Sequence, residues 1–262
     1  MSRPRILLTN DDGIEAPGLA ALAEAMQRLG EVIVIAPRHE MSATGHAVSV
    51  KKEHALRPFH RNGRLFGHSF EGWPADCVKF AVTRWLSPPP DLVVSGINPS
   101  PNVGTNVPYS GTVAAAVEAA MLGVPGMAVS TTWPRGPEPP DFATAARIAA
   151  DLARDILERG LERGVALNVN VPLLPESQIR GRRVVPQGSF RIRDRFESID
   201  PAEDGAPRWT NLGAESMASP NGPETDDTAL AQGYVAITPL GFDMTAYAQV
   251  DEWRRRLDGA IR

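Results

Sequence analysis

The sequence has a single cysteine and no long apolar run. One cysteine, Cys77, among 262 residues excludes an intramolecular disulfide and is compatible with a reducing compartment. No apolar stretch approaches the roughly 20 residues that span a membrane, and the apolar run near the amino terminus is too short for a signal-peptide core. These absences predict a cytoplasmic protein that has no membrane partner.

The sequence also lacks an excess of positive charge and the common nucleotide-binding motifs. Its formal net charge is -4, so nothing indicates a nucleic-acid partner. Neither GxxxxGK[ST] nor a GxGxxG after the first predicted strand occurs, which argues against a nucleoside-triphosphate motor and a dinucleotide dehydrogenase. There is no cysteine pair and no HExxH motif, so a zinc site is not indicated.

What the sequence does contain is a regular alternation of apolar strands and amphipathic helices. Runs rich in β-branched residues are separated by segments with apolar residues at helical spacing, a pattern typical of parallel sheets. We therefore predict an α/β fold with a Rossmann-like, doubly wound, mostly parallel sheet in three layers. The predicted strands are 5–10, 31–37, 91–97, 124–130 and 165–172, and the predicted helices are 17–30, 111–123 and 141–160. Cys77 lies in a further apolar helical pattern and is predicted to be buried.

The pattern changes after about residue 175. Residues 181–196 alternate in polarity, residues 208–227 are rich in turn-forming residues, and residues 233–240 and 246–258 indicate a strand and a terminal helix. We predict a core over 1–175 that carries the site, and a β-rich oligomerisation arm with a return to the core over 176–262. Exposed hairpins of this kind often pair with another subunit. A proline-rich surface loop is predicted at 133–141.

Polar side chains follow two of the predicted strands. The sequence TNDDG places Asp11 and Asp12 after the first strand, and SGIN places Asn98 after the strand at 91–97. In open α/β sheets, ligands bind in the crevice beyond the carboxyl ends of the strands. Adjacent carboxylates repel one another, so a cation would compensate them. The alternative is a simple turn, because Asn, Asp and Gly are the usual turn residues.

The loop at 39–48, HEMSATGHAV, follows the second strand and would face the same crevice. The side chains gathered there are carboxylates, amides and hydroxyls. Oxygen-only ligands suit hard divalent cations such as Mg²⁺, Mn²⁺ or Ca²⁺. The pattern therefore indicates a divalent cation site at this end of the sheet.

The sequence YSGT places Ser110, Gly111 and Thr112 at the start of the alanine-rich helix. A helix amino terminus offers free N–H groups and a favourable dipole to an anion such as phosphate. The alternative is that Ser110 is only an N-cap. The long preceding loop favours a functional role. A cation site and an anion site in one crevice suggest metal-assisted phosphoryl chemistry.

Six motifs, in order from residue 5 to about residue 240, resemble the stationary-phase survival protein SurE family of 5'-nucleotidases. They are ILLTNDDGIEAPGL, APRHEMSATGHAVSV, GWPADCVKFA, PDLVVSGINPSPNVGTNVPYSGTVAAAVEA, LNVNVP and GYVAITPL. The resemblance implies a cytoplasmic, metal-dependent nucleoside monophosphate phosphatase that forms homodimers or homotetramers, with a carboxy-terminal arm exchanged between subunits.

Carried over by position, the resemblance implies one divalent ion per subunit, Mg²⁺ or Mn²⁺. It also implies the residues of the site. The metal ligands would be Asp11, Asp12, Ser42 and Asn98, the phosphate contacts would be Ser110, Gly111 and Thr112, and further substrate-binding candidates are Asn98, Gly45 and His46.

Some positions depart from the family's usual pattern. Glu15 stands where the family usually has histidine, Ala43 replaces a more common glycine, and Thr105-Asn106 replaces a more acidic pair. None of these departures removes a residue from the implied ligand set.

We expect in-line attack of a metal-activated water on a phosphate monoester, with Asp11 or Asp12 as general base. His46 is a candidate acid for the leaving alkoxide, although a loop histidine is more often structural. One rival is a covalent phosphatase with an aspartate nucleophile, whose DxD spacing differs geometrically from adjacent aspartates. The other rival is a non-catalytic nucleotide-binding or sensor module. Activity on 3'-nucleotides and short polyphosphate is an additional possibility.

Overall fold

The computed structural model describes the chain apart from residues 1–2, 133–138, 190, 202–205, 218–223 and 259–262. Within the described residues, a nine-stranded sheet has the order β3-β4-β2-β1-β5-β6-β7-β11-β8. The six strands from β4 to β7 in this order run parallel, β3 and β11 are antiparallel to their neighbours β4 and β7, and β8 is parallel to β11. The strands are β1 (Arg5–Thr9), β2 (Glu31–Pro37), β3 (Leu56–Arg61), β4 (Arg64–Phe70), β5 (Leu92–Asn98), β6 (Gly126–Thr131), β7 (Val165–Val171), β8 (Arg182–Val184) and β11 (Val235–Gly241).

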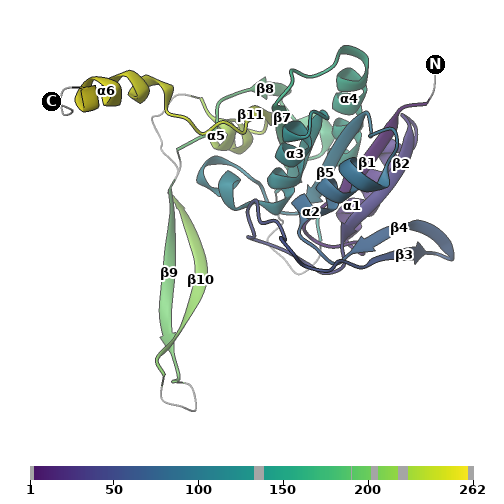
Figure 1. Ribbon diagram of the computed structural model, residues 1–262, viewed down its shortest axis with the longest axis horizontal. Helices are drawn as coiled ribbons and strands as arrows, with labels where there is room; N and C mark the ends of the chain where they lie inside the picture. Colours follow the sequence, from purple (N-terminus) through teal and green to yellow (C-terminus); the bar gives the residue numbers. More distant parts are fainter. Residues whose placement is uncertain (1–2, 133–138, 190, 202–205, 218–223, 259–262) are drawn as a thin grey trace.

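Helices cover both faces of this sheet, as Figure 1 shows. Helices α1 and α4 pack together on one face, and α2 and α3 pack together on the other. The central strands are buried on both sides, so that Leu8 contributes to the first core and Leu7 to the second. The helices are α1 (Pro17–Met26), α2 (Pro74–Phe80), α3 (Gly111–Met121), α4 (Ala143–Arg159), α5 (Asp226–Ala231) and α6 (Tyr247–Asp258), with short helical turns at Ala81–Trp85, Gly104–Tyr109 and Glu176–Gln178.

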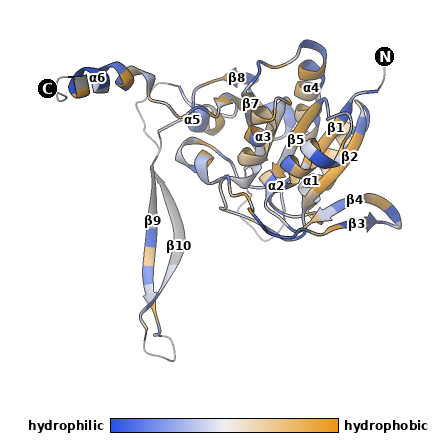
Figure 2. Cartoon of the chain, viewed as in Figure 1, coloured by the Kyte–Doolittle hydropathy of each residue, from blue (hydrophilic) through white to orange (hydrophobic). Residues whose placement is uncertain are grey.

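This arrangement confirms the predicted three-layer, doubly wound, mostly parallel fold. Cys77 is fully buried in α2, and burial raises the pKa of its thiol, which fits the predicted structural role. Figure 2 shows apolar residues concentrated in the central strands β1 and β2. Within the described residues, no helix combines the length and apolar character needed to cross a bilayer.

Helix α3 lies very close to the sheet because its side chains are small. A Cβ atom at Gly126 of β6 would come within 2.1 Å of the Ala116 carbonyl oxygen of α3. A similar close approach occurs on the other face, where a Cβ at Gly18 of α1 would lie 2.2 Å from the Ile97 oxygen. These two glycines let α1 and α3 approach β5 and β6, next to the candidate site.

One hairpin was missing from the prediction, and a second lies in the predicted β-rich arm. The β3–β4 hairpin was not predicted, although Asn62-Gly63, both with positive φ, are typical of a tight hairpin turn. Residues 208–217, predicted to be turn-rich, form strand β10 (Arg208–Met217), which pairs with β9 (Arg191–Ile199). The hairpin confirms the predicted β-rich arm, because pairing with β9 satisfies the backbone despite the low strand propensity of Asn, Gly and Ser. Residues 133–138 of the predicted loop lie outside the described residues.

The β9–β10 hairpin forms a separate two-stranded sheet and extends away from the core in Figure 1. Helix α6 also lies away from the sheet in that view. By contrast, β8 and β11 extend the main sheet beyond β7. The proposed division at residue 175 stays a prediction, since elements on both sides of it share one sheet.

Candidate functional site

The candidate site lies where the order of the parallel strands reverses. From β1 the chain continues to β2 on one side, while from β5 it continues to β6 and β7 on the other side. The register pairs Thr9 with Ser95, so the residues that follow β1 and β5 leave the sheet at the same edge. Such a switch point is the usual binding crevice of a doubly wound sheet. The chain segments that carry Asp11, Asp12 and Asn98 therefore leave the sheet from neighbouring strand ends.

Asp11 is buried against the amino end of α3. The Thr112 hydroxyl donates a hydrogen bond to Asp11 Oδ1 at 2.5 Å, and Asp11 as a residue is 5% exposed. Burial raises the pKa of Asp11, an effect that the hydrogen bonds from Thr112 oppose. The Met41 N–H donates to the Asp11 carbonyl oxygen at 2.6 Å, which holds the 39–48 loop next to the pair.

Asp12 carries the least compensated charge of the site. Its Oδ2 atom is buried and has no hydrogen-bond partner among the described residues. Burial, together with the negative charges of Asp11 and Glu40, raises the pKa of Asp12 to about 7. A buried carboxylate in this situation needs a proton or a cation.

Ser42 is linked to the aspartate pair by Glu40, a residue that the sequence analysis did not predict as part of the site. Ser42 is exposed, and its hydroxyl donates to Glu40 Oε1 at 2.6 Å. Glu40 in turn raises the pKa values of Asp11 and Asp12, so its carboxylate lies within electrostatic range of both. Its position two residues before the implied ligand Ser42 was the only signal for it in the sequence.

Asn98 ends β5 and is half-buried. Its Nδ2 donates to the Ser100 carbonyl oxygen at 2.5 Å, and its Oδ1 has no hydrogen bond to any described residue. Asn98 makes no hydrogen bond to Asp11 or Asp12 within the described chain. The free Oδ1 is an oxygen donor at the same edge of the sheet.

The turn at Ser110, Gly111 and Thr112 uses its hydroxyl groups within the protein. Ser110 is the N-cap of α3, because its Oγ accepts the Val113 N–H at 3.1 Å, as the structural alternative proposed. The Thr112 hydroxyl is committed to Asp11. Among the described residues, the Gly111 N–H has no acceptor, which leaves a free donor at the positive end of the helix dipole.

Gly45 and His46 connect the 39–48 loop to α3. The Gly45 N–H donates to the Tyr109 carbonyl oxygen at 2.8 Å, directly before the helix cap. His46 Nε2 lies 2.8 Å from Oε2 of Glu118, a residue of α3 that the sequence reasoning also missed. Lys79 of α2 contacts the other oxygen of Glu118 at 3.1 Å.

Glu118 is almost completely buried, with a side chain 3% exposed. Burial opposes its ionisation, but the hydrogen bonds and charges of His46 and Lys79 outweigh burial and hold the pKa of Glu118 below 4.5. A lowered carboxylate pKa contributes stability above the unfolded-state pKa, and that stability is lost as the pH falls through the folded-state value.

We expect Glu118→Gln to lower the unfolding temperature at pH 7, because it removes this ionised group. The difference between wild type and variant should narrow as the pH falls below 4.5, where Glu118 begins to bind protons in the unfolded chain. Thermal unfolding followed by circular dichroism between pH 3.5 and pH 8 measures the difference in unfolding temperature between the two proteins. Glu158→Gln, an exposed change on α4, serves as the control. A difference in unfolding temperature that grows as the pH falls would contradict this expectation.

The donor set fits a hard divalent cation. Asp12 Oδ2 and Asn10 Oδ1 are buried without partners among the described residues, and the neighbouring donors are oxygens. The described residues contain no group of three or more His, Cys, Asp and Glu side chains that could hold a metal ion.

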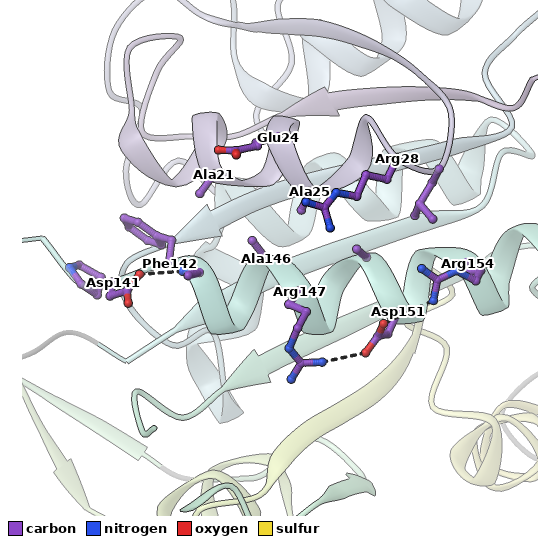
Figure 3. A pocket seen from close by; sticks show the side chains of 14 residues that line it. Ala21, Glu24, Ala25, Arg28, Asp141, Phe142, Ala146, Arg147, Asp151 and Arg154 are labelled. Atoms are coloured by element: carbon purple, nitrogen blue, oxygen red, sulfur yellow. Dashed lines mark hydrogen bonds and ion pairs between the residues drawn. The ribbon is translucent and has the colours of Figure 1, made fainter. Parts of the chain in front are cut away.

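Among the cavities formed by the described residues, those on the two faces of the sheet differ in their relation to the site. A cavity of about 740 Å³ lies between α1 and α4, and none of the predicted site residues lines it (Figure 3). Its side chains, such as Arg147 and Asp151, form ion pairs with one another. A cavity of about 550 Å³ on the other face is lined by His46, Ser110 and Glu118. The second cavity therefore adjoins the candidate site.

Comparison with known proteins places the chain in a family. The family model described as "Survival protein SurE" matches residues 6–194. A protein named 5'-nucleotidase SurE from Syntrophobacter fumaroxidans is 46% identical over 248 residues, which cover 94% of this chain and 97% of that protein. Another of the same name, from Carboxydothermus hydrogenoformans, is 42% identical over 265 residues and covers 98% of both chains.

A solved structure agrees with these matches. The crystal structure of the SurE protein from Aquifex aeolicus has a TM-score of 0.80 and 35% sequence identity, and the match covers 95% of this chain and 98% of that one. The predicted resemblance is confirmed by both sequence and fold. This chain belongs to the SurE family.

Proposed function

We propose that this protein is a metal-dependent phosphatase that hydrolyses nucleoside monophosphates, as a 5'-nucleotidase does. The observation that carries the proposal is the buried, unpartnered Asp12 Oδ2 beside Asp11, at the amino end of α3. The names of the relatives support the substrate class, since they are called 5'-nucleotidase SurE. We extend the proposal to 3'-nucleotides and short polyphosphate, which present a similar terminal phosphate.

In this proposal the cation is held by Asp11, Asp12, Ser42 and Asn98, one per subunit. When bound, Mg²⁺ or Mn²⁺ would neutralise phosphate charge and lower the pKa of a nearby water. Thr112 fixes the Asp11 carboxylate in one orientation through its hydroxyl.

The phosphate would meet the amino end of α3. The free Gly111 N–H and the helix dipole are suited to a non-bridging phosphate oxygen. Ser110 contributes by capping the helix, which keeps this N–H oriented. One of the two aspartates accepts a proton from the attacking water.

The experiment is phosphate release by the purified protein from 5'- and 3'-nucleoside monophosphates and short polyphosphate. We expect release in Mg²⁺ or Mn²⁺, a fall of more than about tenfold in EDTA, and recovery when the cation is added back. Calorimetric titration with the same nucleotides measures binding separately.

Each rival predicts a different result. Nucleotide binding without phosphate release in any divalent cation would favour the sensor module. Release that persists unchanged in EDTA would overturn the metal assignment. A phospho-aspartyl protein trapped by rapid quench would favour the covalent mechanism.

We also propose a homodimer or homotetramer in which the carboxy-terminal arm contacts another subunit. An isolated two-stranded hairpin is marginally stable in water, so β9–β10 needs a partner surface. Phe196 and Trp209 on the hairpin are more than 60% exposed, and Trp253 on α6 is 54% exposed. The dimer, the tetramer and the cytoplasmic location stay predictions.

A further inference from the structure

The Glu118 carboxylate is a buried charge that the proposed mechanism does not use. It lies two helical turns after Gly111 on α3, and its side chain is 3% exposed. Burying an ionised carboxylate is costly unless it is paired and hydrogen-bonded. At a buried position of the alanine-rich helix α3, an apolar residue would be more favourable than a glutamate if packing alone mattered.

Both oxygens of Glu118 have cationic or hydrogen-bonding partners from other elements. Oε1 pairs with Lys79 Nζ from α2 at 3.1 Å, and Oε2 lies 2.8 Å from His46 Nε2. Lys79 and His46 together hold the pKa of Glu118 low despite its burial, so the carboxylate is ionised at neutral pH. An ionised carboxylate can only accept, so His46 Nε2 carries the proton of that hydrogen bond.

The structure holds His46 at two points near the phosphate-binding turn. The preceding residue, Gly45, donates its N–H to the Tyr109 carbonyl oxygen, one residue before the α3 cap. Gly45 has φ +56°, and a Cβ there would lie 2.8 Å from the Pro108 oxygen, so the loop lies close against this segment. His46 and Ser110 line the same cavity of about 550 Å³. The loop that carries His46 is thus bonded to the segment before the α3 cap, while the imidazole lies against α3 at Glu118, in the cavity that extends to Ser110. Among the described residues Nε2 is engaged by Glu118 and Nδ1 has no partner.

We propose that Glu118 is a positioning residue that orients His46 so that its Nδ1–H protonates the ester oxygen leaving the phosphate. This inference rests on the proposed phosphatase function and adds the source of the leaving-group proton. The pairing is comparable to other carboxylate–imidazole pairs, in which the carboxylate sets the ring orientation and stabilises the imidazolium.

The proton balance of this step is complete. Water oxygen forms a bond to phosphorus and gives its proton to one of the aspartates, while the bond between phosphorus and the ester oxygen breaks. The imidazolium of His46 gives its Nδ1 proton to that oxygen, which leaves as the nucleoside hydroxyl. His46 is then neutral with its remaining proton on Nε2, facing Glu118. Exchange with solvent returns a proton to His46 and removes one from the aspartate.

The experiment compares two substrates that differ in their need for a leaving-group proton. A nucleoside 5'-monophosphate expels an alkoxide, whereas p-nitrophenyl phosphate expels a phenolate that is stable without a proton. We expect His46→Ala to lower kcat about 100-fold on the nucleotide and less than about fivefold on p-nitrophenyl phosphate. Glu118→Gln should show the same selectivity with a smaller loss, about tenfold, because the amide oxygen still accepts the Nε2–H.

A double-variant cycle separates positioning from general structural support. If Glu118 acts through His46, Glu118→Gln should have little further effect on kcat in the His46→Ala background. His60→Ala, an exposed change on β3, and Glu158→Gln are matched controls that should leave both substrates unaffected. Thermal unfolding at the assay pH confirms that each variant is folded, and if Glu118→Gln is unstable, His46→Gln gives the same substrate comparison.

Two results would overturn the inference. One is an equal loss of kcat on both substrates, and the other is additive losses in the double variant. Both leave the phosphatase function intact, since wild type still releases phosphate. Absence of phosphate release by wild type from every nucleotide would instead overturn the proposed function.

Discussion

Asp12→Asn lowers the rate of phosphate release by at least about 1000-fold, a loss of roughly 4 kcal/mol of transition-state stabilisation. The variant keeps the size of the side chain but removes the charge whose Oδ2 is buried without a partner. Without this charge the oxygen set loses half of its carboxylates, and neutral oxygens alone bind Mg²⁺ weakly. Asp11→Asn should have a comparable effect, because Asp11 is the other carboxylate of the pair.

Divalent-cation binding gives a second readout that does not depend on turnover. Wild type should unfold at a higher temperature when Mg²⁺ or Mn²⁺ is added, because a ligand of the folded state stabilises it. Asp12→Asn should lose this increase, yet in EDTA it should be at least as stable as wild type, since a poorly compensated buried charge has been removed.

The matched control for this pair is Asp155→Asn, an exposed change on α4. It should keep both the phosphate release and the cation-dependent rise in unfolding temperature. Near wild-type phosphate release by Asp11→Asn or Asp12→Asn in saturating Mg²⁺ and Mn²⁺ would contradict the assignment of the site.

Gly111→Ala, which adds a single methyl group, is expected to lower the rate of phosphate release by about 100- to 1000-fold. A Cβ at Gly111 would lie 2.9 Å from Asp11 Cβ and 3.1 Å from Pro74 Cγ, closer than side chains normally approach. The methyl group would therefore displace Asp11 or shift the first turn of α3. A displacement of about 1 Å at a reacting centre costs on the order of 100-fold, and misaiming the Gly111 N–H adds to that loss.

The Gly111 variant separates geometry from fold stability, because alanine is otherwise favourable in a helix. Gly111 does not have a positive φ, so the backbone itself tolerates alanine. The control is Gly241→Ala, where no atom lies within 4 Å of the added Cβ and φ is also not left-handed. Phosphate-release assays and unfolding temperatures of both variants measure the effect. Normal turnover by Gly111→Ala would show that the Asp11 contact does not set the geometry of the site.

The fold was largely predictable because its signals are local. The apolar runs of β1, β2 and β5 are continuous since parallel strands are buried on both faces, and Pro17 marks the start of α1. The β3–β4 hairpin gave a weaker signal, because β3 has no buried residue, β4 is only partly buried, and Pro58 interrupts β3. The β-rich arm was predicted as a region, but the bounds of β10 were not, since its residues favour turns and, among the described residues, it pairs with β9 alone.

Part of the candidate site was likewise predictable from the sequence, and part was not. The aspartate pair, the YSGT turn and the oxygen-rich loop were visible as residue types after strand ends. Glu40 and Glu118 were not, because a single glutamate in a loop or in a helix resembles an ordinary solvated residue. Glu118 became recognisable only when its burial and its two partners were known.

The sequence by itself determined most of the strands and helices of the core, the residue types of the candidate site and, through its motifs, the family. These follow from hydrophobic periodicity and from side-chain types, which are properties of short segments. Tertiary structure decided which segments meet. Asp11 and Thr112 are 101 residues apart and His46 and Glu118 are 72 apart, yet each pair shares a hydrogen bond. Such contacts depend on the strand order at the switch point and on how closely α3 packs on the sheet, and local periodicity encodes neither.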